Sequence, residues 1–193
     1  MLIPRPETEL LVELALARLA GTAAPRIVDV GCGSGAIGLA LAHERPDALV
    51  TGTDISPAAL ALAARNAQRL GLRLELLQSD LLTAPAVQKA ARAAHLIVSN
   101  PPYLPAADVH GAFPEVLAEP AEALYSGPDG LEAFRRLLEQ AGGLLQAGAA
   151  LLVELDPRNV RAAAAAASPR LWLPGSVTAD LAGRERFLLL ERK

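Results

Sequence analysis

Short apolar runs alternate along this chain with longer segments in which apolar residues recur every three or four positions. The runs predict buried strands over residues 26–30, 48–53, 72–78, 96–99 and 149–154, and the helical spacing predicts helices over 6–19, 35–44, 57–70, 131–146 and 158–167. Two further strands are expected near 170–178 and 186–191, close enough to pair antiparallel. Such alternation indicates an α/β fold: a doubly wound, mostly parallel, Rossmann-like sheet of seven strands with an antiparallel edge strand.

Local signals sharpen two parts of this pattern. Ser56-Pro57 predicts a capped helix start and Gly71 its end, with an apolar face formed by Leu60, Ala63, Ala64, Ala67 and Leu70. The segment 101–130, rich in Pro, Gly, Ala and Glu, is the longest irregular stretch. Long loops in compact domains are often functional.

Composition fits one domain over 1–193 with an interior made mainly of Leu and Ala. The chain is 52% hydrophobic but only 3% aromatic, and its mean hydropathy is +0.29. It lacks the roughly 18 uninterrupted apolar residues needed to span a bilayer, and its charged first residues do not resemble a secretory signal. One cysteine, Cys32, cannot form an internal disulfide. A cytoplasmic enzyme without membrane partners is expected.

The charge pattern argues against stable nucleic-acid binding. The net charge is −3, arginines are dispersed, and Lys89 and Lys193 are the two lysines. Duplex binding requires clustered cations that displace counterions from phosphates. Three histidines and one cysteine without close spacing also predict no metal site.

A glycine-rich loop follows the first predicted strand, at Asp29-Val30-Gly31-Cys32-Gly33-Ser34-Gly35. Glycines there let the backbone turn tightly and approach a ligand, and Asp54, after the second strand, can accept hydrogen bonds from ribose hydroxyls. The literal G-x-G-x-x-G of Gly33–Gly38 keeps an NAD-dependent dehydrogenase open as an alternative. A glycine-rich turn without any ligand is the plainer interpretation.

Two features disfavour the dehydrogenase. The first glycine after the strand is Gly31, which places the literal fingerprint too far into the helix, and Asp29 precedes the loop. The resulting Asp-x-Gly-x-Gly-x-Gly pattern resembles motif I of class I S-adenosylmethionine-dependent methyltransferases.

Asp80 after the third strand could accept from an adenine amino group, with Leu81 over the ring, or simply cap the next turn. The predicted cofactor-binding residues are Asp29, Gly31, Cys32, Gly33, Ser34, Gly35, Asp54, Ile55, Asp80, Leu81 and Asn100.

Asn100-Pro101-Pro102-Tyr103 ends the fourth predicted strand. The prolines cannot continue a central strand, so a stiff turn brings an amide, free backbone carbonyls and a flat ring together. Those groups can grip a planar amide or an adenine amino group. A proline-capped strand end with a packed tyrosine is the alternative.

Motif I combined with this turn resembles class I enzymes that methylate unactivated nitrogen, on adenine N6 or glutamine N5. Three more segments resemble the peptide chain release factor N5-glutamine methyltransferases: Leu2–Glu9, the loop with Glu119-Pro120 and Gly127–Leu131, and Asp180–Arg186. The resemblance implies methylation of the Gly-Gly-Gln glutamine of class 1 release factors, in translation termination, with S-adenosylmethionine converted to S-adenosylhomocysteine. That family normally carries a small helical domain before the first segment, and this chain begins where that domain would end.

The same resemblance assigns roles to the turn. Asn100 and the Pro101 carbonyl accept the substrate N–H groups, Tyr103 packs on the planar amide, and Pro102 is a further substrate-binding residue. No general base is needed, so His43, His95 and His110 are expected to be surface or packing residues, while Arg5 and Glu7 are placed near the mouth of the site. Other interpretations are a glutamine methyltransferase for a ribosomal protein, an adenine-N6 nucleic-acid methyltransferase, and an inactive S-adenosylmethionine-binding module.

Overall fold

The computed structural model describes residues 7–111 and 121–193. Its strands are β1 (Arg26–Val30), β2 (Leu49–Asp54), β3 (Glu75–Gln78), β4 (Leu96–Ser99), β5 (Ala150–Glu154), β6 (Ser176–Ala179) and β7 (Glu185–Glu191). Its helices are α1 (Glu7–Arg18), α2 (Ala36–Glu44), α3 (Pro57–Leu70), α4 (Pro85–Arg92), α6 (Glu132–Leu144) and α7 (Val160–Ala166), with 3₁₀ turns η1 (Ala106–Gly111) and η2 (Ala121–Ala123). Among the described helices, none is both long and apolar enough to cross a membrane.

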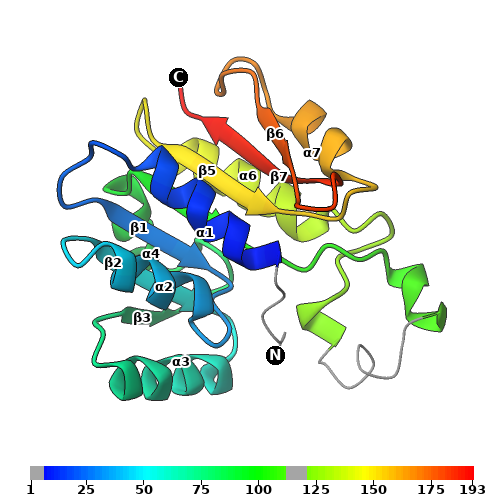
Figure 1. Ribbon diagram of the computed structural model, residues 1–193. Helices are drawn as coiled ribbons and strands as arrows, with labels where there is room; N and C mark the ends of the chain where they lie inside the picture. The colour runs from blue at the N-terminus through cyan, green and yellow to red at the C-terminus, as the bar shows by residue number, and fades with distance from the viewer. Residues whose placement is uncertain (1–6, 112–120) are drawn as a thin grey trace.

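The strands form one seven-stranded sheet in the order β3-β2-β1-β4-β5-β7-β6 (Figure 1). The first five strands in that order are parallel, and β7 runs antiparallel to both β5 and β6. The predicted doubly wound sheet is therefore confirmed, including the antiparallel pairing of its last two strands. The reversed strand, β7, lies one place in from the edge, which β6 occupies.

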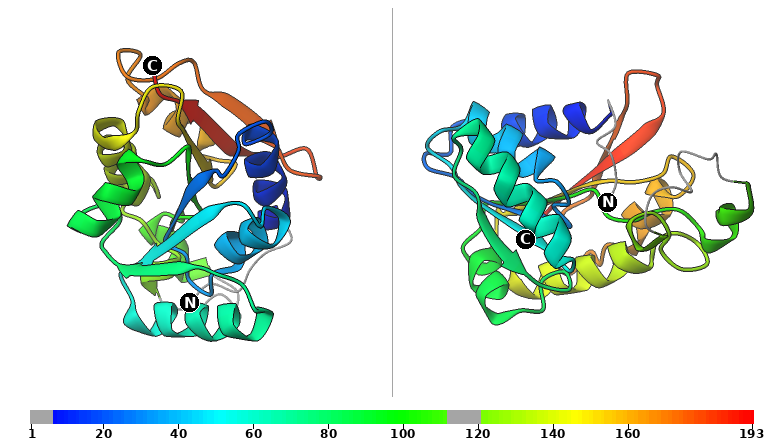
Figure 2. Two further views of the ribbon diagram at one scale, coloured as in Figure 1. Left: turned by 90° about the vertical axis from the view of Figure 1, so that its left-hand side faces the viewer. Right: turned by 90° about the horizontal axis from the view of Figure 1, so that it is seen from below.

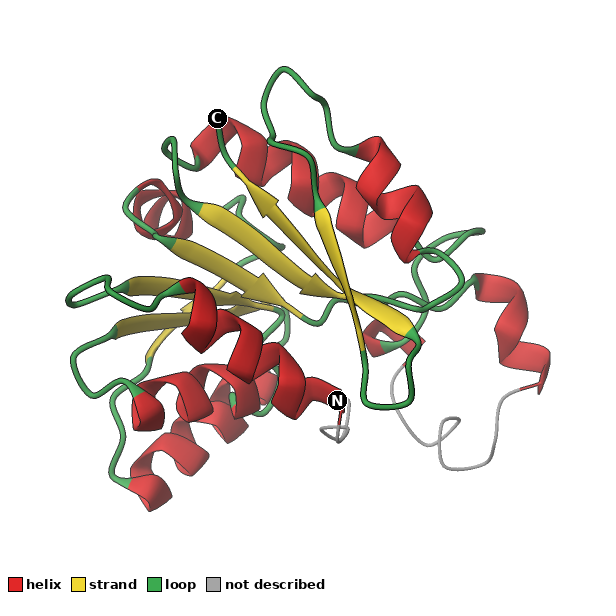
Figure 3. Ribbon diagram, turned by 45° about the horizontal axis from the view of Figure 1, so that its top comes forward, coloured by secondary structure: helices red, strands yellow, loops and turns green. Residues whose placement is uncertain are grey.

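Helices cover both faces of this sheet (Figure 3). Successive side chains of a strand point to opposite faces, so each strand contributes residues to the core on both sides. Ile27 and Val98 belong to a buried cluster completed by α1 and α2, whereas Val28 and Ile97 belong to a second cluster completed by α4, α6 and α7. The central strands are thus apolar on both faces, as parallel strands between helical layers must be.

Three local predictions need correction. The buried stripe of α3 is Ala59, Ala63 and Ala67, while Leu70 of the predicted face is 62% exposed. The strand predicted over 72–78 begins only at Glu75, so this edge strand, β3, offers α3 little surface to cover. Helix α4 was not predicted because its eight residues bury little more than Val87 and Ala91. The caps were predicted correctly: Ser56 Oγ accepts from Ala59 N at 3.3 Å, and Gly71 ends α3 with φ 65°.

The irregular segment after β4 extends beyond the carboxyl edge of the sheet and folds back on itself (Figures 1 and 2). Leu104 N donates to Leu124 O, and Ser126 N donates to Leu104 O, both at 2.9 Å. Gly130 then approaches the Tyr103 backbone so closely that a Cβ at 130 would collide with its carbonyl oxygen. This glycine, with φ 77°, therefore fixes the return of the loop against the Asn-Pro-Pro-Tyr turn.

Substituting Gly130 tests this close approach, with Gly148 as a matched control. Gly148 has φ 81°, but a Cβ at this position would meet open space, so Gly148→Ala carries only left-handed strain, about 1–2 kcal/mol. Gly130→Ala adds a backbone collision and is expected to lose about 1–3 kcal/mol more in free energy of unfolding. Urea unfolding of both variants measures the difference. Equal losses would show that the contact does not constrain the loop.

Candidate functional site

A cavity of about 800 Å³ opens at the carboxyl ends of β1, β2, β3 and β4, where the strand order reverses between β1 and β4. Ligands of doubly wound sheets bind in this crevice, and the volume suits a small organic molecule. The lining residues that the sequence predicted are Gly31, Cys32, Gly33, Ser34, Asp54, Ile55, Asp80, Leu81, Asn100 and Pro102.

The glycine loop forms the floor of this cavity between β1 and α2. Gly31 N and Cys32 N both donate to Thr53 O, at 2.8 and 2.9 Å, which ties the loop to β2. Gly31 has φ 70°, and a Cβ built on it meets no atom within 4 Å, so a side chain here would project into open space. The Cys32 thiol is buried, and that burial raises its pKa, which makes it an unreactive packing residue.

Asp54 holds the loop and the next helix together. Its Oδ2 accepts from Gly33 N and its Oδ1 accepts from Ser56 N, both at 2.9 Å. A carboxylate has about four lone-pair sites, so capacity remains for hydroxyl donors in the cavity. The geometry is compatible with the predicted ribose-binding role.

Asp29 and Gly35 lie behind the loop and do not line the cavity. Asp29 is fully buried, its Oδ2 accepts from Gly38 N at 2.9 Å, and burial raises its pKa to about 7. A Cβ on Gly35 would lie 3.2 Å from Ala63 and Leu39. Both residues thus shape the turn into α2 from the protein side.

Asp80 and Leu81 follow β3 and form the opposite wall. Asp80 pairs with Arg136 of α6, with 2.5 Å between Oδ2 and the guanidinium nitrogen. Leu81 adopts φ 51°, a left-handed conformation that is unusual for a leucine. It lines the cavity wall, where the sequence predicted an aliphatic cover for a ring.

The Asn-Pro-Pro-Tyr turn divides between cavity and core. Asn100 Nδ2 donates to Thr8 Oγ1 at 3.3 Å, while Asn100 Oδ1 is buried with no hydrogen-bond partner among the described residues. Pro102 lines the cavity, Pro101 is buried, and Tyr103 packs against the larger hydrophobic cluster. The Tyr103 carbonyl accepts from Asn159 Nδ2 at 3.2 Å.

Several lining residues were not predicted, among them Thr8, Leu62, Arg65, Ala123, Ala133 and Arg136. They come from helices and turns that are distant from one another in sequence. Only Leu62 and Arg65 could have been predicted, because their helix, α3, begins shortly after Asp54. Glu7 was predicted near the mouth of the site and pairs with Arg184, whereas Arg5 and the Glu119-Pro120 segment lie outside the described residues. Within those described, no cluster of His, Cys, Asp or Glu could hold a metal ion.

Known proteins resemble this chain in both sequence and fold. The family model "Methyltransferase small domain" matches residues 7–154. Release factor glutamine methyltransferases from Deinococcus radiodurans and Moorella thermoacetica are 47% identical over 191 residues and 45% identical over 196 residues. The matches cover 99% and 100% of this chain but 66% and 68% of the relatives, so the chain spans about two thirds of their length.

A solved structure gives the same assignment. The protein-(glutamine-N5) methyltransferase (release factor-specific) from Alicyclobacillus acidocaldarius is 28% identical with a TM-score of 0.61, covering 99% of this chain and 94% of that one. Sequence and fold therefore agree along almost the whole chain, which belongs to the release factor glutamine methyltransferase family.

Proposed function

We propose that this chain transfers a methyl group from S-adenosylmethionine to the side-chain amide nitrogen of the glutamine in the Gly-Gly-Gln motif of class 1 release factors. The supporting observation is that Asn100 lines the cavity and that its Oδ1 is buried without a hydrogen-bond partner among the described residues, in a chain of this family. Buried acceptors are rarely left without a donor, and a substrate N–H is the donor proposed for this one.

The residues around the glycine loop fit the cofactor. Gly31 leaves room for close backbone approach, Asp54 offers carboxylate lone pairs to a ribose, and Leu81 presents an aliphatic surface to a ring. When bound, S-adenosylmethionine supplies an electrophilic sulfonium methyl group. The chain's own task is then to hold the amide nitrogen of the substrate in line with it.

Asn100 and the Pro101 carbonyl are proposed to accept the two N–H bonds of the substrate amide. An amide nitrogen is a poor nucleophile because its lone pair is delocalised into the carbonyl. Two fixed acceptors orient this nitrogen and draw electron density toward it. Orientation of this kind contributes up to roughly 7–11 kcal/mol in well-placed intramolecular reactions. Tyr103, which the sequence assigned to packing on the planar amide, packs instead against the larger hydrophobic cluster and is not among the lining residues of the cavity.

Histidine has no part in this proposal. His95 Nδ1 accepts from Arg26 N at 3.0 Å. Arg26 is the first residue of β1, so this contact lies at the end of the strand opposite to the cavity. His43 lies in the last turn of α2. Methyl transfer leaves a positive charge on the amide, which makes the remaining N–H acidic. The proton is therefore lost after transfer, and a base before transfer is not required.

The direct test is incubation with labelled S-adenosylmethionine and a purified class 1 release factor, followed by peptide mass mapping. Label is expected on the glutamine of Gly-Gly-Gln and is expected to vanish when that glutamine is changed to alanine in the release factor. Label on a ribosomal protein or on nucleic acid, with none on the release factor, would refute the proposed substrate.

Asn100→Ala separates turnover from cofactor binding. Removing one of two acceptors of the substrate amide is expected to lower kcat roughly 10²-fold or more, as loss of a single preorganised hydrogen-bonding group does elsewhere. Affinity for S-adenosylmethionine should change little. Near-normal turnover in single-turnover assays would contradict the role of Asn100.

Asp54→Ala should weaken the binding of S-adenosylmethionine, which Asn100→Ala leaves unchanged. Loss of hydrogen bonds to a charged group is expected to raise the Kd for S-adenosylmethionine about 10- to 100-fold. Asp47→Ala is the matched control, because Asp47 Oδ2 also accepts from a backbone N–H, that of Ala24, at 2.9 Å, but lies outside the cavity. Titration calorimetry on both variants measures the effect, and equal affinities would rule out a ribose contact by Asp54.

A further inference from the structure

Next to Asn100 lie two further buried polar side chains, those of Thr8 and Glu154. Thr8 stands in the first turn of α1 and is 7% exposed, and Glu154 ends β5 and is fully buried. Strands β4 and β5 are adjacent and pair Ser99 with Val153, so the next residues, Asn100 and Glu154, emerge side by side. The start of α1 lies over these strand ends (Figure 1).

The hydrogen bonds among these side chains have a fixed direction. Thr8 Oγ1 donates to Glu154 Oε2 at 2.9 Å, and Asn100 Nδ2 donates to Thr8 Oγ1 at 3.3 Å. A hydroxyl has one proton to donate, and an ionised carboxylate only accepts. The Thr8 proton is therefore committed to Glu154, so its oxygen can only accept from Asn100. The amide must then present NH₂ to Thr8 and keep its oxygen free.

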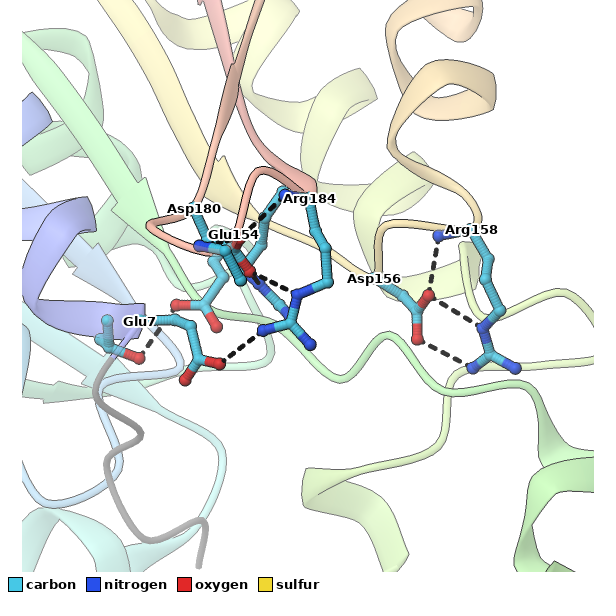
Figure 4. A network of polar contacts seen from close by, with 9 residues as sticks. Glu7, Glu154, Asp156, Arg158, Asp180 and Arg184 are labelled. Carbon is cyan, nitrogen blue, oxygen red and sulfur yellow. Dashed lines mark hydrogen bonds and ion pairs between the residues drawn. The ribbon is translucent and has the colours of Figure 1, made fainter.

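Charged residues of the β6–β7 hairpin surround Glu154 (Figure 4). Arg186 and Arg184 both pair with Asp180, at 3.3 and 2.9 Å, and Arg184 also reaches Glu7 at 3.1 Å. Burial raises the pKa of Glu154, and the nearby Glu7 charge acts in the same direction. The hydrogen bond from Thr8, the charge of Arg186 and the neighbouring Asn100 amide oppose this rise. Within the hairpin, the charge of Arg186 therefore favours the ionised, accepting form of Glu154.

We propose that Glu154, acting through Thr8, is a positioning residue that fixes which way round the Asn100 amide faces. The inference rests on the proposed function, in which Asn100 Oδ1 accepts from the substrate. If Glu154 is protonated or Thr8 loses its hydroxyl, the amide is released to turn over. It then presents NH₂ to the substrate amide, so that two donors face each other and the substrate nitrogen is no longer oriented.

Thr8→Val tests this role, because valine keeps the shape of threonine and removes the hydroxyl. We expect kcat on the release factor to fall roughly 10- to 100-fold, a loss typical of misorientation, with the Kd for S-adenosylmethionine within about twofold. KM for the release factor should change less than kcat. Thr8→Ser, which restores the hydroxyl, should recover most of the loss.

Thr51→Val is the matched control. Thr51 Oγ1 donates to Glu75 at 2.9 Å, across β2 and β3, so this variant loses the same kind of bond away from Asn100. It should keep kcat. A Thr8→Val enzyme as active as Thr51→Val would overturn the proposal.

The pH profile adds a readout that a purely structural role would not move. In the unmodified chain kcat should fall as the pH drops through the raised pKa of Glu154, because protonation ends its accepting role. Thr8→Val should lose this acidic limb, since Asn100 is already uncoupled. An unaltered acidic limb in Thr8→Val would contradict the coupling.

A measurement without substrate distinguishes failure of this inference from failure of the proposed function. The Asn100 side-chain NH₂ resonances, assigned by comparison with Asn100→Asp, should shift with the titration of Glu154 and lose that dependence in Thr8→Val. If these resonances behave so while no release factor is methylated, the proposed substrate is wrong and the positioning role stands. If they ignore both changes, the positioning role is wrong.

Discussion

Strand β1 is the constraint on which the site depends, because it pairs in parallel on both sides. Its last residue, Val30, lies opposite Thr53 of β2 and Ser99 of β4, and Ser99 Oγ donates to Val30 O at 2.7 Å within the core. Three strands therefore end at one level. The glycine loop, Asp54 and Asn100 follow these three ends, so one sheet register brings the proposed donor site and acceptor site together.

The polar side chains next to Asn100 connect three segments that are far apart in sequence. These segments are the first turn of α1, the end of β5 and the β6–β7 hairpin. Thr8 donates to Glu154, the charge of Arg186 acts on Glu154, and Arg186 pairs with Asp180. Two of the segments that resemble the family, around Glu7-Thr8 and over 180–186, meet in this network. In the proposed positioning role, these segments support the Asn-Pro-Pro-Tyr turn from behind.

The sequence predicted the order and type of most elements, because the central strands are short apolar runs and α3 carries clear end signals at Ser56 and Gly71. It missed α4, a helix of eight residues with two buried apolar side chains, and it misplaced the face of α3, which packs on the edge strand β3, where few apolar residues are needed. Among site residues, those on the strand ends were predicted and those on distant helices, such as Thr8 and Arg136, were not. Parallel strands bring their carboxyl ends to one edge of the sheet, so residues that follow predicted strands can be placed together from the sequence. Which helix residues lie over the crevice depends on how the helices pack, and this cannot be read from the sequence.

The sequence by itself determined the class of fold, and it predicted that the glycine-rich loop and the Asn-Pro-Pro-Tyr turn belong to one site. The tertiary structure alone decided that Asp29 and Gly35 support the loop from behind, and that Asp80 is paired with Arg136. It also decided that the Asn100 amide is held by Thr8 and Glu154. Hydrogen-bond direction and burial depend on which side chains meet in space, and residues some 146 positions apart meet only when the sheet is assembled.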